Sequence, residues 1–181
     1  MFNSSVTFEY VYTQKRKLKA KSAIKELHYK FFVTKKLDCG NAFMIKYIVN
    51  ISVYANELLR VDFYPKIKSD KKFMMLTEQF KFGVIGGTVF EIMKNAIYRT
   101  GCNTFGLLWA ETLEESTQKK LKSGTKRFNV YKGILSLKMD PDKFEVRIDE
   151  ENSLIFIIPN TRINQKNDII LNYGKIFKEN F

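Results

Sequence analysis

Residues that build metal centres and disulfide frameworks are scarce in this sequence. Two cysteines and one histidine occur among its 181 residues. Structural zinc sites commonly use four Cys or His ligands, so three such residues in all argue against a metal site. Cys39 and Cys102 lie in no paired-cysteine motif, and we interpret them as buried or incidental thiols rather than as a disulfide or redox pair.

Linkers and long apolar runs are also missing. The three prolines and nine glycines are scattered along the chain, so nothing divides it, and we expect one domain over residues 1–181. The most apolar segment, residues 42–54, is interrupted by Lys46 and Asn50. A membrane-spanning helix needs about 20 apolar residues, so we expect no membrane segment and a soluble protein made in the cytoplasm.

What the chain has in excess is positive charge. Its 31 Lys and Arg residues against 19 Asp and Glu give a formal charge of +12, which favours an anionic partner such as nucleic acid or an acidic protein surface. The candidate contacts form two runs, Lys15, Arg16, Lys17, Lys19 and Lys21, and then Lys119, Lys120 and Lys122. The alternative is a solvated lysine-rich surface, encoded by an AT-biased genome without selection for binding.

Alternating apolar and aromatic residues predict most of the strands. The pattern indicates strands over residues 6–12, 43–54 and 58–64, the last two as antiparallel neighbours, and β-branched and aromatic residues favour a strand from His28 onward. Further along the chain, an apolar strand is expected over 103–110 and a hairpin over 144–148 and 154–158. The tail, residues 169–181, is apolar at intervals, a pattern that does not distinguish a strand from a helix.

Two helices have recognisable signals. Thr88 and Glu91 have the spacing of a capping box, in which the threonine oxygen accepts from a backbone amide one turn on. This spacing predicts a helix that begins at or beside Val89. Gly101 supplies the glycine that commonly ends a helix. A second amphipathic helix is expected over 126–137.

This order of elements resembles the acetyltransferase fold of the GNAT superfamily. The resemblance covers residues 58–159, with amino-terminal strands in 1–57 and a carboxy-terminal extension in 160–181. Five short segments are also similar to small GNAT-like proteins encoded by tailed bacteriophages: Val61-Asp62-Phe63-Tyr64, Leu76-Thr77, the seven residues Gly87 to Met93, Trp109-Ala110-Glu111, and the six residues Lys126 to Tyr131. The resemblance implies an α+β fold with a GNAT-like mixed, largely antiparallel sheet and two main helices.

The resemblance also implies a cofactor position. In that superfamily, the pyrophosphate of acetyl-CoA lies on backbone amides at the start of the first of these helices, where free amides and the helix dipole favour an anion. Gly86, Gly87 and Thr88 correspond to this position. Gly83 stands where the superfamily has Arg or Gln, and two adjacent glycines are also compatible with a simple tight turn.

Catalytic positions are implied in the same way. Tyr131 matches the tyrosine that protonates the departing thiolate as a general acid, although a tyrosine at this helical spacing can equally be a core residue. A general base would be a carboxylate near the split between the central strands, and Glu78 and Glu111 are the candidates by position. No other acid-base pair, nucleophile or metal cluster is evident.

Three functions are compatible with these observations. The first is a non-catalytic structural or assembly protein of a phage particle or other large complex, in the host cytoplasm or the virion, which needs no cofactor, forms homo-oligomers and contacts other subunits and nucleic acid. The first alternative is an acetyl-CoA-dependent N-acetyltransferase. The second is a nucleic-acid-binding module, in which the lysine runs act together with the stacking side chains Tyr10, Tyr12, Tyr29 and Phe31; the other interpretation of these aromatics is a core position.

Overall fold

Seven strands form a single sheet in this chain. The computed structural model describes residues 7–14, 20, 22–36, 42–66, 82–108, 126–149 and 154–180. The strands are β1 (Tyr10–Gln14), β2 (Lys25–Lys36), β3 (Ala42–Val53), β4 (Leu58–Pro65), β5 (Thr104–Leu108), β6 (Phe144–Asp149) and β7 (Leu154–Pro159). The helices are α1 (Phe82–Thr100), α2 (Lys126–Lys138), the 3-10 helix η2 (Asn160–Gln165) and α3 (Lys166–Asn180).

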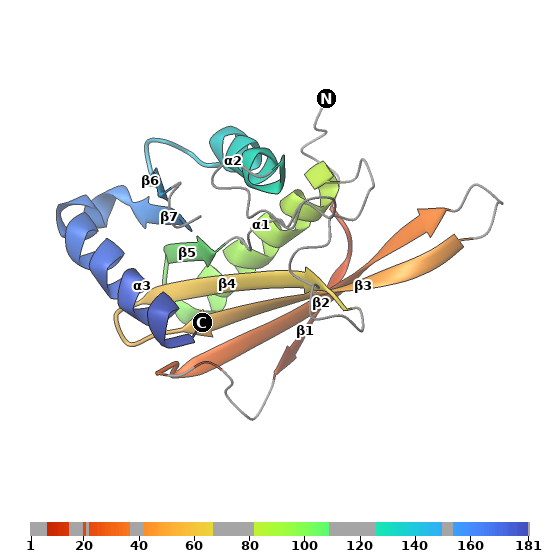
Figure 1. Ribbon diagram of the computed structural model, residues 1–181, viewed down its shortest axis with the longest axis horizontal. Helices are drawn as coiled ribbons and strands as arrows, with labels where there is room; N and C mark the ends of the chain where they lie inside the picture. The colour runs from red at the N-terminus through yellow and green to blue at the C-terminus, as the bar shows by residue number, and fades with distance from the viewer. Residues whose placement is uncertain are drawn as a thin grey trace, which may run out of the picture.

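The sheet is mixed but largely antiparallel. Its strand order is β1-β2-β3-β4-β5-β7-β6, and β4 and β5 form the parallel pair. The expected β3–β4 and β6–β7 hairpins are confirmed. Parallel neighbours require a crossover connection, and α1 lies in the connection between β4 and β5 (Figure 1). The predicted α+β class is confirmed, and the tail that the sequence left undecided is helical.

The main core lies between the sheet and the pair of helices α1 and α2. Side chains alternate along a strand, and Leu27, Tyr29, Phe31 and Val33 of β2 are buried on this face. From the helices, Ile92 of α1 and Ile134 of α2 belong to the same cluster. Of the face that the apolar spacing predicted for this helix, Ile134 and Leu135 are buried, while the side chains of Phe128 and Tyr131 lie outside the described residues.

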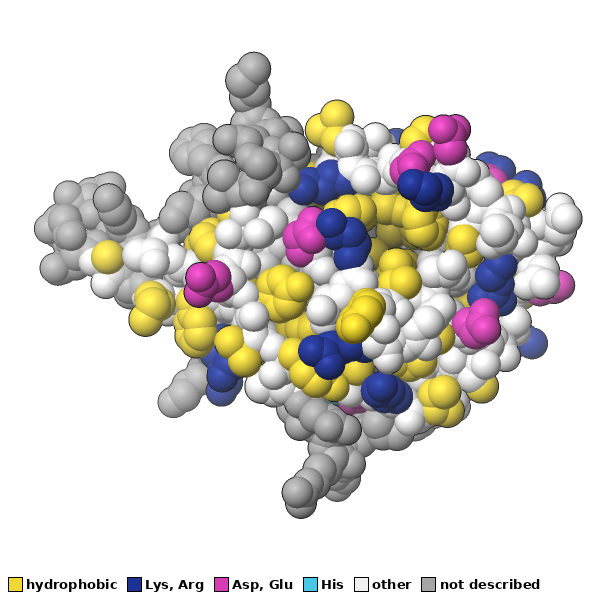
Figure 2. Space-filling model, turned by 180° about the vertical axis from the view of Figure 1, so that it is seen from behind, with side chains coloured by type: hydrophobic (Ala, Val, Ile, Leu, Met, Phe, Trp, Pro, Cys, Tyr) yellow, Lys and Arg dark blue, Asp and Glu magenta, His cyan; other side chains and the backbone are white. Residues whose placement is uncertain are grey.

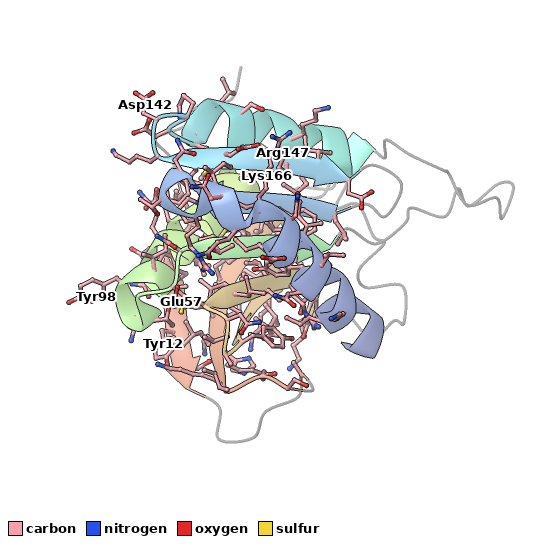
Figure 3. The ribbon with its side chains drawn as sticks, turned by 90° about the vertical axis from the view of Figure 1, so that its left-hand side faces the viewer. Tyr12, Glu57, Tyr98, Asp142, Arg147 and Lys166 are labelled. Carbon is pink, nitrogen blue, oxygen red and sulfur yellow. The ribbon has the colours of Figure 1, made fainter. Side chains whose placement is uncertain are left out.

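The opposite face of the sheet is covered by α3, which lies across the sheet from α1 (Figure 3). Tyr173 of α3 is fully buried, and its hydroxyl accepts from the Leu59 backbone N–H at 3.0 Å. The same hydroxyl lies 2.8 Å from the Leu59 carbonyl and 3.0 Å from the Thr104 carbonyl. A Cβ at Gly106 would lie 2.4 Å from the Tyr173 ring, so glycine is what allows α3 to sit this close.

The first strand begins later than predicted. We expected a strand over residues 6–12, but β1 is Tyr10–Gln14 and residues 7–9 precede it. The Phe8 backbone N–H donates to the Thr88 hydroxyl at 2.9 Å, so it is not available to pair with β2. The Phe8 ring still stacks on Phe31, with ring centroids 5.9 Å apart. The alternation therefore identified the buried side of this segment correctly, but not its backbone partner.

Candidate functional site

The parallel pair formed by β4 and β5 is short. Their ladder runs from Leu58↔Thr104 to Val61↔Leu107, after which β4 continues along β3 as far as Pro65. A hollow of about 20 Å³ lies beside this pair. Its lining is almost entirely apolar and comes from β4, β5, α1 and α2: Phe63, Gly86, Val89, Phe90, Met93, Leu107, Ile134 and Leu135. A space of this size holds about one water molecule.

The glycine pair expected before the first helix lies inside it. α1 begins at Phe82, so the predicted start at Val89 is wrong. A helix commits its amides to carbonyls four residues earlier, and only the first turn keeps free amides. Gly86 and Gly87 are buried in the second turn, where Gly86 lines the apolar hollow. The free amides on which the cofactor prediction depended therefore belong to residues earlier in the chain, and the cofactor role of this pair stays a prediction.

Thr88 is not a helix cap. Its hydroxyl donates to the Val84 carbonyl at 2.7 Å and accepts from the Phe8 backbone N–H. Glu91, the other half of the expected capping box, pairs instead with Lys94 at 2.8 Å. Glycine disfavours a helix interior by about 1 kcal/mol relative to alanine, but burial of Ile85 and Val89 against the sheet compensates for this cost. The helix therefore begins earlier in the chain than the local signals predicted, because tertiary packing outweighs those signals.

The side chains of the other predicted site residues lie outside the described parts of the chain. Tyr131 lies in α2, but its side chain is outside the described residues. Glu78 and Glu111 are also outside them, as are both basic runs: Lys15, Arg16, Lys17, Lys19, Lys21, Lys119, Lys120 and Lys122. Their catalytic and binding roles stay predictions.

The aromatic residues considered as base-stacking surfaces are part of the core. Tyr29 and Phe31 are 1% and 0% exposed, and Tyr10 and Tyr12 pack against the same cluster. Phe31 stacks on Tyr47 with ring centroids 5.1 Å apart. Burial raises the pKa of Tyr29 to about 12, while its hydroxyl donates to Asn95 at 3.0 Å. Because Tyr29 and Phe31 are inaccessible, the stacking surface proposed from the sequence is wrong, and the core interpretation of these two residues is confirmed.

The structure brings together a buried polar cluster that sequence reasoning missed. We define the β2–β4 polar cluster as Glu26, His28, Asn50, Arg60 and Asp62, which share the face of the sheet opposite α1 and α2. The register places His28 beside Asn50, and Asn50 beside Asp62. Glu26 and His28 are 4% and 3% exposed. The available signal was polar residues at alternate positions of three neighbouring strands, which is easily mistaken for a solvent-facing side.

The geometry of this cluster suits charge balance. The His28 ring lies between Glu26 Oε2 at 3.1 Å and Asn50 Oδ1 at 2.6 Å. Both partners are oxygens, so a ring nitrogen that carries a proton donates to the oxygen that it faces. Arg60 donates to Asp62 Oδ2 from Nε and Nη2 at 3.0 and 2.7 Å. Burial raises the pKa of Asp62, and the neighbouring guanidinium opposes that effect. Each anion thus has a cationic or donor partner, which is how buried charges are tolerated.

A polar groove lies on the α3 side, where the β3–β4 turn meets η2. It has a volume of about 370 Å³, and Glu57, Arg162 and Asp168 are among its lining residues. Arg162 Nη1 lies 3.1 Å from Thr104 Oγ1 and 3.3 Å from Glu57 Oε2. Glu57 has a φ of 59°, a left-handed conformation unusual for a glutamate. These contacts join η2 to the turn and account for the position of the guanidinium.

Cys102 is a free, buried thiol, as expected. In the described ranges, no three His, Cys, Asp or Glu side chains are placed to hold a metal ion. None of the helices in these ranges has the length and apolar character required to cross a membrane. Comparisons with protein-family models, curated protein sequences and solved structures found no match to this chain.

Proposed function

We propose that this protein is a non-catalytic GNAT-like structural or assembly subunit of a phage particle or another large complex. The order of elements supports the GNAT-like part of this proposal. Antiparallel strands are followed by a helix, a strand, a second helix and a closing hairpin, the same order on which the resemblance rests. The parallel β4–β5 pair within an otherwise antiparallel sheet also fits the mixed sheet that the resemblance implies.

The observation that carries the non-catalytic part is the small size of the hollow beside the β4–β5 pair. An enzyme that binds a cofactor as large as acetyl-CoA needs a cleft of several hundred Å³. Here Phe63 of β4, Leu107 of β5 and Leu135 of α2 line a hollow of about 20 Å³. Gly86 faces the same hollow from within α1. A hollow this small, with an apolar lining, favours a packed structural domain over a cofactor site.

Apolar side chains on the outer surface support contacts with neighbouring subunits. Tyr98 of α1 is 89% exposed and Leu137 of α2 is 72% exposed, and Figure 3 shows Tyr98 pointing away from the sheet. Figure 2 views the side that carries α1 and α2, where apolar side chains reach the surface between charged ones. Tyrosine is enriched in protein interfaces, because its ring buries area while its hydroxyl remains wet.

Cofactor binding is the direct test against the alternative, an acetyl-CoA-dependent N-acetyltransferase. Ligand at 100 times its Kd stabilises a folded protein by about 2.7 kcal/mol, which corresponds to roughly 5–10 °C in melting temperature for a chain of this size. We expect no shift with millimolar acetyl-CoA. ADP is the control for binding of the nucleotide part alone. A shift with acetyl-CoA that ADP does not reproduce would contradict the proposal.

The assembly role predicts a defined multimer. Native mass spectrometry of the purified chain should show a discrete oligomer, and replacing Tyr98 or Leu137 by serine should shift it toward the monomer. Leu171 of α3, which is 64% exposed on the other side of the sheet, provides the matched control. A wild-type protein that stays monomeric at high concentration would count against homo-oligomeric assembly.

A further inference from the structure

The far ends of β2 and β3 form an arm that extends beyond the other strands (Figure 1). β1 pairs with β2 only as far as Phe31, and β4 pairs with β3 only from Tyr47 onward. Between these limits the β2–β3 ladder continues from Phe32↔Lys46 to Lys36↔Ala42. In the described parts of the chain, no third strand joins the ladder there.

One face of the arm belongs to the core and the other is open. On the odd-numbered face, Val33 and Tyr47 are 2% and 3% exposed. On the even-numbered face, Phe32 is 45% exposed and Met44 is 71% exposed. The open face therefore carries large apolar side chains that are in contact with solvent and do not belong to the core.

Lysines flank these apolar side chains. Lys46 lies directly opposite Phe32 in the ladder, while Lys30 precedes Phe32 by two positions on the same face. Neighbouring strands are about 4.8 Å apart and same-face residues on one strand about 7 Å apart, so both ammonium groups can reach the surroundings of the Phe32 ring. Beyond Lys30, the register places Ile48 and then Tyr64 of β4 on this face. We define the arm surface as Lys30, Phe32, Met44, Lys46 and Tyr64.

We propose that the arm surface binds single-stranded nucleic acid. Lysines neutralise backbone phosphates, and an exposed ring beside them offers a stacking platform for an unpaired base. A duplex would leave Phe32 without a stacking partner, because its bases are already stacked on one another. The formal charge of +12 favours a polyanion over a second copy of this chain. This surface lies on the opposite face from the buried aromatics Tyr29 and Phe31, and it does not depend on the proposed assembly role.

Oligonucleotide binding to the full-length chain tests this proposal. Fluorescence anisotropy with labelled oligo-dT and oligo-U of about 15 nucleotides measures affinity for DNA and RNA separately, since sites of this kind cover roughly 4–16 nucleotides. We expect binding at about 50 mM salt that weakens steeply by 200 mM. Duplex DNA of the same length should bind more weakly, and polyglutamate should compete poorly. A preference for the duplex or for polyglutamate would overturn the proposal, as would no binding at low salt.

Variants separate the two parts of the surface. Replacing Lys30 and Lys46 by glutamine should reduce the salt slope by about 1.4, because each phosphate contact in a single strand contributes about 0.7. Phe32→Ala should weaken binding by about tenfold with the salt slope unchanged, since a stacked base contributes a factor of this order. The matched control is Lys166→Gln with Lys175→Gln on α3, which removes the same charge elsewhere. Equal effects of the two lysine pairs, or unchanged binding by Phe32→Ala in a protein with wild-type melting temperature, would overturn the proposal.

Discussion

At the scale of single residues, one missing side chain fixes where α3 packs. Gly106 of β5 faces the Tyr173 ring, and a Cβ there would approach it to 2.4 Å. Real Cβ atoms do not tolerate such a distance, so either the ring or the strand would have to move. The Tyr173 hydroxyl bonds to the backbones of both β4 and β5, and movement of the ring would break these contacts as well.

Replacing Gly106 by alanine should therefore destabilise the protein. Overpacking costs about 1–3 kcal/mol, measurable as a lower midpoint in urea denaturation. Gly133→Ala is the matched control, because Gly133 lies on an exposed part of α2 and nothing lies within 4 Å of its added Cβ. That substitution should stabilise the protein by about 0.5–1 kcal/mol, since alanine favours helices. Equal effects of the two substitutions would contradict the packing argument.

At the scale of elements, the second turn of α1 is connected to the start of the chain. The Thr88 hydroxyl accepts from the Phe8 backbone N–H, although 80 residues separate them in sequence. Thr88 is 0% exposed, so the bond is shielded from solvent. The segment before β1 is therefore held against the helix, and this contact substitutes for pairing with β2.

Thr88→Val should release this segment while preserving the shape of the side chain. A buried hydrogen bond contributes about 1 kcal/mol, and the Phe8 amide would lose its acceptor. Hydrogen exchange at the Phe8 amide should accelerate by about fivefold or more, because 1 kcal/mol corresponds to roughly that factor. Ser136→Ala removes a hydroxyl that donates only within its own helix, to Lys132, and should leave Phe8 unchanged. Unaltered exchange at Phe8 in Thr88→Val would contradict this role.

At the scale of the whole molecule, buried tyrosines on both faces of the sheet link stability to alkaline pH. Burial raises the pKa of Tyr29 to about 12 and that of Tyr173 well above its ordinary value of 10. The folded state therefore keeps protons that the unfolded chain releases near pH 10. This stabilisation is complete below pH 10 and is lost as the pH rises above it, for Tyr29 over the range from 10 to about 12.

The free energy of unfolding should fall above pH 10, by up to about 1.4 kcal/mol per pH unit for each tyrosine. Urea denaturation as a function of pH measures this slope. Tyr29→Phe should make the decline between pH 10 and 12 shallower. Tyr98→Phe removes a hydroxyl from a side chain that is 89% exposed and should leave the profile as in the wild type. A wild-type stability that stays constant up to pH 12 would contradict the linkage.

Much of the sheet could be predicted from the sequence, because its signals are local. Alternation in β3 and β4 and the short turn at residues 54–57 predict an antiparallel hairpin without knowledge of the rest of the chain. The β6–β7 hairpin follows in the same way, and the buried apolar face of β2 follows from Leu27, Tyr29 and Phe31. In each case the period of the pattern determines which side chains are buried, and the intervening segment is short enough to bring the two strands together.

The candidate site was harder to predict than the hairpins, because it depends on contacts between segments that are far apart in the sequence. Thr88 has the local pattern of a cap, but burial of the preceding turn extended the helix to Phe82. The polar residues Glu26, His28 and Asn50 look solvent-facing in the sequence, and only the register of three strands shows them as a buried cluster.

The sequence by itself determined most of the strands, the second helix and the α+β class, because residues two to four positions apart encode them. The tertiary structure alone decided where α1 begins, that the tail is a helix, and which aromatic and lysine side chains share an open face. Those outcomes depend on contacts such as Tyr173 with Leu59, which lie 114 residues apart. No local pattern records a partner at that separation, because chain folding must first bring the two segments together.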